Sequence, residues 1–298
     1  MTISRIKQAK IKPAKPKLSK LDLAYQHCQY IARKHYENFP VASLVLPARL
    51  RKHVAAVYAF ARQADDLADE GILSSEARLT ALTNMATTLR ECSEGKTTND
   101  PVYLAITDTI TIFKLPIMLF EDLISAFSQD VNKHRYHDFN ELLEYCRRSA
   151  NPVGRIMLHF HDQTDVTSLH QSDDICTALQ LINVYQDLHQ DYHELGRIYI
   201  PLNEMKDHGV TENHFAHDIN DAALQDLMQL QYRRTSELLQ RGALLGNRLQ
   251  GRFGLEIRLI IAGGKRILFK LQCQQNCFNR PRLKLNDKLW MLYAALLP

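Results

Sequence analysis

The chain has 298 residues, of which 45% are hydrophobic and 23% are charged, a composition typical of a soluble globular protein. No apolar run approaches the ~18 residues that a membrane-spanning helix needs, so we expect no segment to cross a bilayer. The length is compatible with one large helical domain as well as with two smaller domains.

The net charge of +4 originates in the N-terminal tail. Residues 1–20 contain seven lysines and arginines and no acid, so the remainder of the chain carries a net charge of −3. We expect this tail to be a solvated, disordered basic arm, and attraction to an anionic membrane surface is the alternative role. The body has no basic face interleaved with aromatic residues, which argues against a nucleic-acid partner. The six cysteines have no metal-binding spacing and indicate reduced thiols in the cytoplasm.

From Leu21 onward apolar residues recur at three- and four-residue spacing, which predicts an all-α chain without a sheet. The breaks between the predicted helices coincide with proline, glycine and asparagine residues, where helices commonly end or begin. No repeat or linker interrupts residues 21–298, so we predict one domain there. The predicted helices span residues 21–36, 47–70, 74–93, 101–113, 116–130, 138–161, 171–194, 218–249, 252–277 and 286–296.

One predicted helix carries a polar stripe on an otherwise apolar surface. Between residues 54 and 69 most side chains are alanine or larger apolar residues, and the polar residues recur at three- and four-residue spacing. These polar residues are Tyr58, Arg62, Asp65, Asp66 and Asp69. A single arginine cannot neutralise three buried carboxylates, so further cations are expected nearby. The alternative is the acidic end of a surface helix, but acids at a helix C-terminus oppose the helix dipole.

A second predicted helix repeats this arrangement. Gln180, Asn183, Asp187 and Asp191 fall along one face of a segment that is otherwise apolar. Aspartates four residues apart on two facing helices can present oxygen atoms to Mg²⁺, which usually leaves its other positions to water and phosphate. The two stripes therefore predict a magnesium site that binds a diphosphate.

The sequence lacks several motifs that would indicate other chemistry. It contains no glycine-rich dinucleotide or nucleotide loop, no serine-hydrolase motif and no zincin motif. The thirteen histidines are scattered along the chain, and His189 and His193 are interpreted as ordinary helix residues rather than metal ligands. Nucleotide-dependent, serine-hydrolase and zincin functions are therefore not supported.

Residues 58–70, 151–154 and 180–201 resemble the squalene and phytoene synthase family of head-to-head prenyl synthases, and the resemblance extends over about residues 24–295. It implies the isoprenoid synthase fold, a single helical bundle around a central apolar cavity. It also implies that both aspartate motifs lie at the mouth of that cavity and that Mg²⁺ is the cofactor.

The resemblance and the polar stripes together define a candidate site. The expected metal ligands are Asp65, Asp66, Asp69, Asp187 and Asp191. The expected catalytic residues are Tyr58, Arg62, Asp65, Asp69, Asp187 and Asp191. The expected substrate-binding residues are Arg62, Asn151, Gln180, Asn183, Arg197 and Tyr199.

Within the family, residues 37–43, 145–152 and 262–268 are most similar to the hydroxysqualene synthases of bacterial hopanoid pathways. Arg147 stands where squalene and phytoene synthases carry a tyrosine, and Gln186 stands where they carry an arginine. The resemblance implies Mg²⁺-dependent ionisation of presqualene diphosphate and capture of the rearranged carbocation by water. It further implies functional coupling to other hopanoid-pathway enzymes, in the cytoplasm or at the inner face of the membrane.

Two alternatives remain at this stage. The nearer one is a prenyltransferase that condenses two prenyl diphosphates head-to-head to presqualene diphosphate, squalene or phytoene. The other is a non-catalytic scaffold of the same fold, against which the intact aspartates of both motifs argue.

Overall fold

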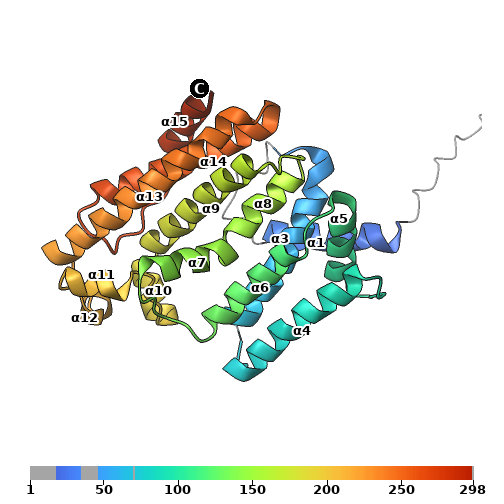
Figure 1. The fold of residues 1–298 in the computed structure, drawn as a ribbon, viewed down its shortest axis with the longest axis horizontal. Helices are drawn as coiled ribbons and strands as arrows, with labels where there is room; N and C mark the ends of the chain where they lie inside the picture. The colour runs from blue at the N-terminus through green and yellow to red at the C-terminus, as the bar shows by residue number, and fades with distance from the viewer. Residues whose placement is uncertain (1–17, 35–45, 70, 297–298) are drawn as a thin grey trace, which may run out of the picture.

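The computed structural model describes residues 18–34, 46–69 and 71–296, and every regular element in these ranges is a helix (Figure 1). This confirms the predicted all-α class. The helices are α1 (Lys20–Lys34), α3 (Ala48–Asp69), α4 (Ser75–Ser93), α5 (Pro101–Phe113), α6 (Met118–Asp130), α7 (Phe139–Ser149), α8 (Asn151–His159), α9 (Val166–Gln186), α10 (Leu188–Leu195), α11 (Leu202–Asp207), α12 (Glu212–Ala216), α13 (Ala222–Arg248), α14 (Gly251–Cys273) and α15 (Leu285–Leu296).

Parts of the chain named above lie outside the described residues, namely the first seventeen residues of the basic tail, the stretch 37–43 and Glu70. Among the helices that are described, none has the length and hydrophobicity needed to cross a membrane.

Side-chain caps fix where several helices begin. Ser74, Asp100, Asp138, Asp165 and Asp221 each accept a hydrogen bond from a backbone N–H of the first turn that follows. Such caps satisfy N–H groups that have no partner within the helix and typically stabilise a helix by about 1 kcal/mol.

Two of the predicted helices are each divided in two. The predicted helix 138–161 breaks at Ala150 into α7 and α8, because Pro152 lacks an N–H and disfavours a continuous helix through the preceding residues. The predicted helix 171–194 begins earlier, after its cap at Asp165, and breaks at Asp187 into α9 and α10. The short helices α11 and α12 were not predicted.

The apolar core consists of two clusters. One is built mainly by α1 and α3–α6, and the other mainly by α7, α9, α13 and α14 (Figure 1). Met157 on α8 packs against both clusters, so α8 joins the two parts of the core. The first aspartate motif lies on α3, which belongs to the cluster built by α1 and α3–α6. The second motif follows α9, which belongs to the cluster built by α7, α9, α13 and α14.

Backbone hydrogen bonds bring the ends of α6 and α10 together. The Ile198 N–H donates to the His134 carbonyl at 3.0 Å, and the Leu202 N–H donates to the Tyr136 carbonyl at 2.9 Å. The segment that follows α10 therefore runs beside the segment that follows α6. This pairing places Arg197 next to Asp130, the last residue of α6.

A tight contact between α9 and α13 yields a first prediction. A Cβ atom at Gly242 would lie 2.6 Å from Ile175 Cγ1 and 2.8 Å from the Gln171 carbonyl oxygen. We expect Gly242→Ala to lower the free energy of unfolding by about 1–3 kcal/mol, because backbone atoms must move. Gly263→Ala is the control, since among the described residues its Cβ would meet the flexible end of Met291, at 3.1 Å, and no backbone atom. Chemical denaturation measures both variants, and equal stability of the two would contradict the prediction.

Glu256 on α14 yields a second prediction. The residue is 3% exposed, its Oε2 has no hydrogen-bond partner within the described ranges, and burial raises its pKa to about 7. The carboxyl is protonated in both states below about pH 4.5, and between about pH 4.5 and 7 the unfolded chain ionises before the folded chain. Stability should therefore fall as the pH rises through this window.

Glu256→Gln removes this titration. The variant should match the wild type near pH 4.5 and exceed it by up to about 3 kcal/mol at pH 8. Urea unfolding at a series of pH values measures the difference. Glu237→Gln, at an exposed glutamate of α13, serves as the control and should stay within about 0.5 kcal/mol of the wild type. Parallel pH curves for the wild type and Glu256→Gln would be inconsistent with this assignment.

Candidate active site

The first aspartate motif occupies the last turns of α3. Arg62 lies one turn before the acids and pairs with two of them, with Nη1 3.0 Å from Asp65 Oδ2 and Nη2 2.6 Å from Asp66 Oδ1. Tyr58 lies a further turn back and is half-buried, and burial raises its pKa although the Arg62 charge opposes the shift. Arg62 is therefore ion-paired with Asp65 and Asp66, and the charges of all three act on Tyr58.

Arg197 connects this motif to the second one. Its guanidinium contacts the Asp69 carboxylate through Nη2, at 2.6 Å, and Nη1, at 3.3 Å, although the two residues are 128 positions apart. Nη2 also donates to the Asp130 carbonyl at 3.0 Å, and the Arg197 N–H donates to the Asp191 carbonyl at 2.8 Å. Only 8% of the Arg197 side chain is exposed. This buried cation thus ties the ends of α3 and α6 to α10.

The second aspartate motif lies where α9 gives way to α10. Asp187 occupies the break, and its carbonyl accepts the Asp191 N–H at 2.7 Å. The Asp187 carboxylate pairs with Arg280, whose Nε lies 2.5 Å from Oδ1. Gln186 donates through Nε2 to the Pro281 carbonyl at 2.7 Å. The segment around residues 280–281 therefore covers this end of α9 and supplies a second cation.

Asp130 connects the carboxylates of the two motifs electrostatically, because its charge contributes to the raised pKa of Asp191 and it is itself influenced by Asp69 and Asp65. Burial and the negative charge of Asp187 raise the pKa of Asp191 to about 7, against the opposing charges of Arg197 and Arg280. Burial also raises the pKa of Asp130 to about 7, opposed by the Arg197 charge, and the charges of Asp69 and Asp65 contribute to the increase. The acids of α3, α6 and α10 therefore share one partly buried region.

This donor set fits a hard divalent cation. Six carboxylates lie in this region, those of Asp65, Asp66, Asp69, Asp130, Asp187 and Asp191. Within the part of the chain that the structure describes, three guanidiniums contact them, those of Arg62, Arg197 and Arg280. Asp130 Oδ1 is buried and has no hydrogen-bond partner among the residues that the structure describes. Oxygen donors with excess negative charge suit Mg²⁺, whose remaining coordination positions are available to phosphate oxygens.

Comparison with known proteins identifies the family. The squalene/phytoene synthase family model matches residues 32–288. The chain belongs to the squalene/phytoene synthase family. It is therefore an enzyme of this family, as the sequence motifs indicated.

Individual relatives agree with this assignment. The chain is 35% identical over 249 residues to a hydroxysqualene synthase of Rhodopseudomonas palustris. The aligned region covers 83% of this chain and 84% of the relative. It is 31% identical over 193 residues to a phytoene synthase of Mycobacterium tuberculosis, covering 65% of this chain and 62% of the relative. The solved squalene synthase HpnC from Alicyclobacillus acidocaldarius superposes with a TM-score of 0.81 at 34% identity, covering 88% of this chain and 97% of the other. The predicted isoprenoid synthase fold is thereby confirmed.

Four other residues of this squalene/phytoene synthase were predicted to bind substrate. Asn151 is buried, and its Oδ1 accepts a hydrogen bond from the Thr177 hydroxyl at 3.0 Å, which holds α8 against α9. Tyr199 is buried and stacks on Tyr136, with ring centroids 5.5 Å apart. Gln180 and Asn183 lie on α9, two turns and one turn before Asp187, the former half-buried and the latter exposed. Their roles in substrate binding stay predictions.

Two residues of the site were not predicted from the sequence. Asp130 accepts a hydrogen bond from the Tyr145 hydroxyl at 2.9 Å, and the Tyr145 ring lies 5.7 Å from that of Tyr199. Arg280 reaches Asp187 from a segment without regular structure. Neither residue belongs to a periodic polar stripe, so the pattern that revealed the aspartate motifs could not reveal them.

Proposed function

We propose that this enzyme ionises presqualene diphosphate and captures the rearranged carbocation with water, which yields hydroxysqualene and diphosphate. The observation that carries this proposal is the group of carboxylates and guanidiniums that Arg197 joins across α3, α6 and α10. The similarity to two hydroxysqualene synthases, together with Arg147 and Gln186 at positions where squalene and phytoene synthases carry other residues, favours the water-capturing branch of the family. The reaction would belong to hopanoid biosynthesis and would couple this chain to the other enzymes of that pathway.

The first step breaks the carbon–oxygen bond to diphosphate, and the bonding electrons leave with the diphosphate. We propose that Asp65, Asp66, Asp69, Asp187 and Asp191 hold Mg²⁺, directly or through water. Bound Mg²⁺ would supply Lewis-acid stabilisation of the leaving group. Arg62 and Arg197 would add positive charge on the same side, where a preorganised cation stabilises the charge that develops in the transition state.

The second step forms a carbon–oxygen bond. A water molecule donates a lone pair to the rearranged cation and releases one proton to solvent, so charge and atoms balance. Gln180 and Asn183 on α9 and Tyr58 on α3 are the candidates that hold this water. Each lies within two helical turns of an aspartate motif, and exclusion of bulk water by the surrounding apolar residues would let rearrangement precede capture.

A product assay tests the proposal. The purified chain is incubated with presqualene diphosphate or with farnesyl diphosphate, with Mg²⁺ or with a chelator, and mass spectrometry identifies the products. Hydroxysqualene from presqualene diphosphate only when Mg²⁺ is present is the expected result. Presqualene diphosphate, squalene or phytoene made from simple prenyl diphosphates would instead establish the condensing alternative, which the phytoene synthase relative keeps open. A folded chain that releases no diphosphate from any of them would be a scaffold.

We further propose that the enzyme works at the cytoplasmic face of a membrane, and that α15 contacts the lipid surface. Five exposed hydrophobic residues of α15 recur at positions that fall on one helical face: Leu285, Leu289, Leu292, Tyr293 and Leu296. The opposite side of the helix is buried, with Met291 and Ala295 in the interior. An outward apolar stripe of this kind is typical of interfacial helices.

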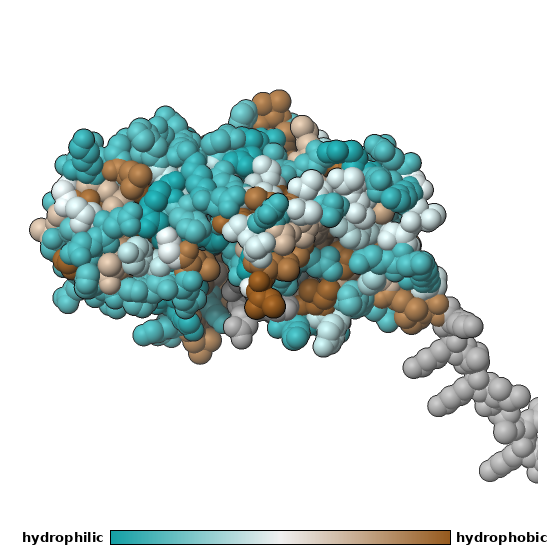
Figure 2. All heavy atoms as spheres, turned by 90° about the horizontal axis from the view of Figure 1, so that it is seen from below, coloured by the Kyte–Doolittle hydropathy of each residue, from teal (hydrophilic) through white to brown (hydrophobic). Residues whose placement is uncertain are grey.

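Charge favours an anionic lipid surface as the occupant of this stripe. Lys284 and Lys288 are exposed beside it, and Arg282 is exposed just before the helix. Basic residues next to an apolar stripe attract anionic headgroups, by about 1 kcal/mol each. Figure 2 shows that hydrophobic residues also form patches on an otherwise hydrophilic face. The stripe on α15 differs from scattered apolar residues because it has helical periodicity.

Vesicle sedimentation of the full chain tests this contact. We expect binding to vesicles that contain phosphatidylglycerol, weaker binding to pure phosphatidylcholine, and about tenfold weaker binding for the double variant Leu285→Gln, Leu289→Gln. Leu244→Gln, at an exposed leucine of α13, is the matched control and should bind like the wild type. Unchanged binding of the double variant, or a dimer in sedimentation velocity that only this double variant disrupts, would overturn the proposal.

A further inference from the structure

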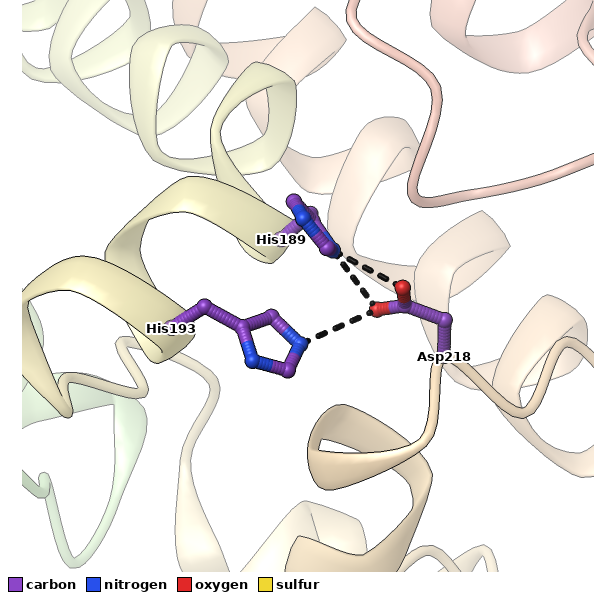
Figure 3. Close-up of side chains that lie close together, drawn as sticks. All are labelled: His189, His193 and Asp218. Carbon is purple, nitrogen blue, oxygen red and sulfur yellow. Dashed lines mark hydrogen bonds and ion pairs between the residues drawn. The ribbon is translucent and has the colours of Figure 1, made fainter.

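The far side of α10 carries a second group of metal-ligating side chains. His189 and His193 lie one turn apart on this helix, and Asp218 approaches both from the turn that follows α12 (Figure 3). His189 Nδ1 lies 2.8 Å from Asp218 Oδ2, and His193 Nε2 lies 3.6 Å from Asp218 Oδ1. One ligand atom from each residue lies within 4.8 Å of the other two.

This group is distinct from the aspartate motifs. His189 and His193 each lie two residues from Asp191 on α10, and two residues correspond to roughly 200° around a helix, so the histidines point away from Asp191. Asp187 lies at the break before α10 and pairs with Arg280, whereas the histidines contact Asp218. The donors also differ in chemistry, because imidazole nitrogen suits Zn²⁺, Cu²⁺ and Ni²⁺ whereas carboxylate oxygen alone suits Mg²⁺. Two imidazoles and one carboxylate, with a fourth position open to water, form a common zinc ligand set.

The geometry is close to what such an ion requires. Ligand atoms at about 2.0–2.1 Å from a tetrahedral ion lie roughly 3.3 Å from one another. The distances of 2.8 Å and 3.6 Å from the imidazole nitrogens to the Asp218 oxygens lie on either side of this separation. Both histidines are exposed and Asp218 is half-buried, so an ion can enter from solvent. The alternative is that the histidines only form ion pairs with Asp218.

We propose that His189, His193 and Asp218 bind one late first-row transition-metal ion, such as Zn²⁺, separately from the Mg²⁺ of the aspartate motifs. The ion would fasten α10 to the turn before α13. Because α10 carries Asp191 and begins next to Asp187, the fastened helix is the one that positions the second aspartate motif. The metal-binding inference does not depend on which prenyl diphosphate the enzyme uses.

Equilibrium dialysis of the full chain against Zn²⁺ alone tests the site. We expect the wild type to bind one zinc ion, and His189→Ala, His193→Ala and Asp218→Ala each to weaken binding at least about tenfold, since loss even of an outer-shell partner costs about 10–100-fold. His217→Ala, at an exposed histidine in the same turn, is the matched control and should bind like the wild type. Circular dichroism confirms that each variant is folded.

Electron paramagnetic resonance of bound Cu²⁺ distinguishes the two classes of site. Two imidazole ligands should produce nitrogen hyperfine structure that is reduced by His189→Ala or His193→Ala and unchanged by Asp65→Asn. Unchanged zinc affinity in the three ligand variants, an equal loss in His217→Ala, or a copper signal without nitrogen coupling would each overturn the proposal. The group would then be an ion-paired contact only.

Discussion

Asp65→Asn and Asp187→Asn are each expected to reduce diphosphate release by at least about 10²–10³-fold while the chain stays folded. Asp65 lies near the end of α3 and is ion-paired with Arg62, and Asp187 lies at the break before α10. Each substitution removes one negative charge and keeps the shape of the side chain, so the expected loss comes from weaker cation binding and weaker stabilisation of the leaving group. Diphosphate release at saturating Mg²⁺ measures the effect, and far-ultraviolet circular dichroism measures helix content.

The matched control is Asp174→Asn. Asp174 also lies on α9, but it pairs with Arg241 of α13, with Oδ1 3.0 Å from Nη2. This variant removes an ion-paired aspartate of the same helix at a distance from the motif, and it should release diphosphate at the wild-type rate. Near-normal turnover in Asp65→Asn or Asp187→Asn would remove that residue from the mechanism. An equal loss in Asp174→Asn would show that the effect is not specific to the motifs.

The fold class was predictable because most helices have a strong apolar period. The helices between residues 74 and 130 begin and end within two residues of the predicted positions, where serine, aspartate or proline marks the start. The breaks at Ala150 and Asp187 were not predicted. The spacing of apolar residues continues across both positions, whereas the helix ends at each of them. A hydrophobic pattern reports which face is buried and is insensitive to a single residue that leaves the helical conformation.

The relation between the two motifs was predicted only in outline. Repeated polar stripes suggested that the acids of two helices converge, and the structure joins them through Asp69 and Arg197. The contribution of Asp130 depends on the pairing of two loop segments, and that of Arg280 depends on a non-helical segment. Contacts of this kind are set by tertiary packing between distant parts of the chain, so no local spacing in the sequence encodes them.

Arg197→Met is expected to lower both stability and activity. The substitution removes the guanidinium that contacts Asp69 and the Asp130 carbonyl, and it leaves those groups partly buried without their cation. Loss of one partner of a buried pair typically costs about 3–5 kcal/mol. The Asp69 side chain retains 26% exposure, so we expect the lower end, about 3 kcal/mol, in urea unfolding. Diphosphate release should fall as well, because α3 and α10 are no longer fastened to each other.

Two further variants separate the role of charge from the role of geometry. Arg197→Lys keeps the positive charge, but a single ammonium cannot reproduce the planar contacts to both Asp69 oxygens and the Asp130 carbonyl, so its stability should be intermediate. The double variant Asp69→Asn, Arg197→Met removes both charges and should recover part of the stability lost in Arg197→Met, which a double-mutant cycle quantifies. An Arg197→Met chain within about 0.5 kcal/mol of the wild type would mean that solvent or other cations satisfy Asp69 equally well. In that case the aspartate motifs would be held together by the packing of α6, α7 and α8, and Arg197 would contribute only to the charge of the site.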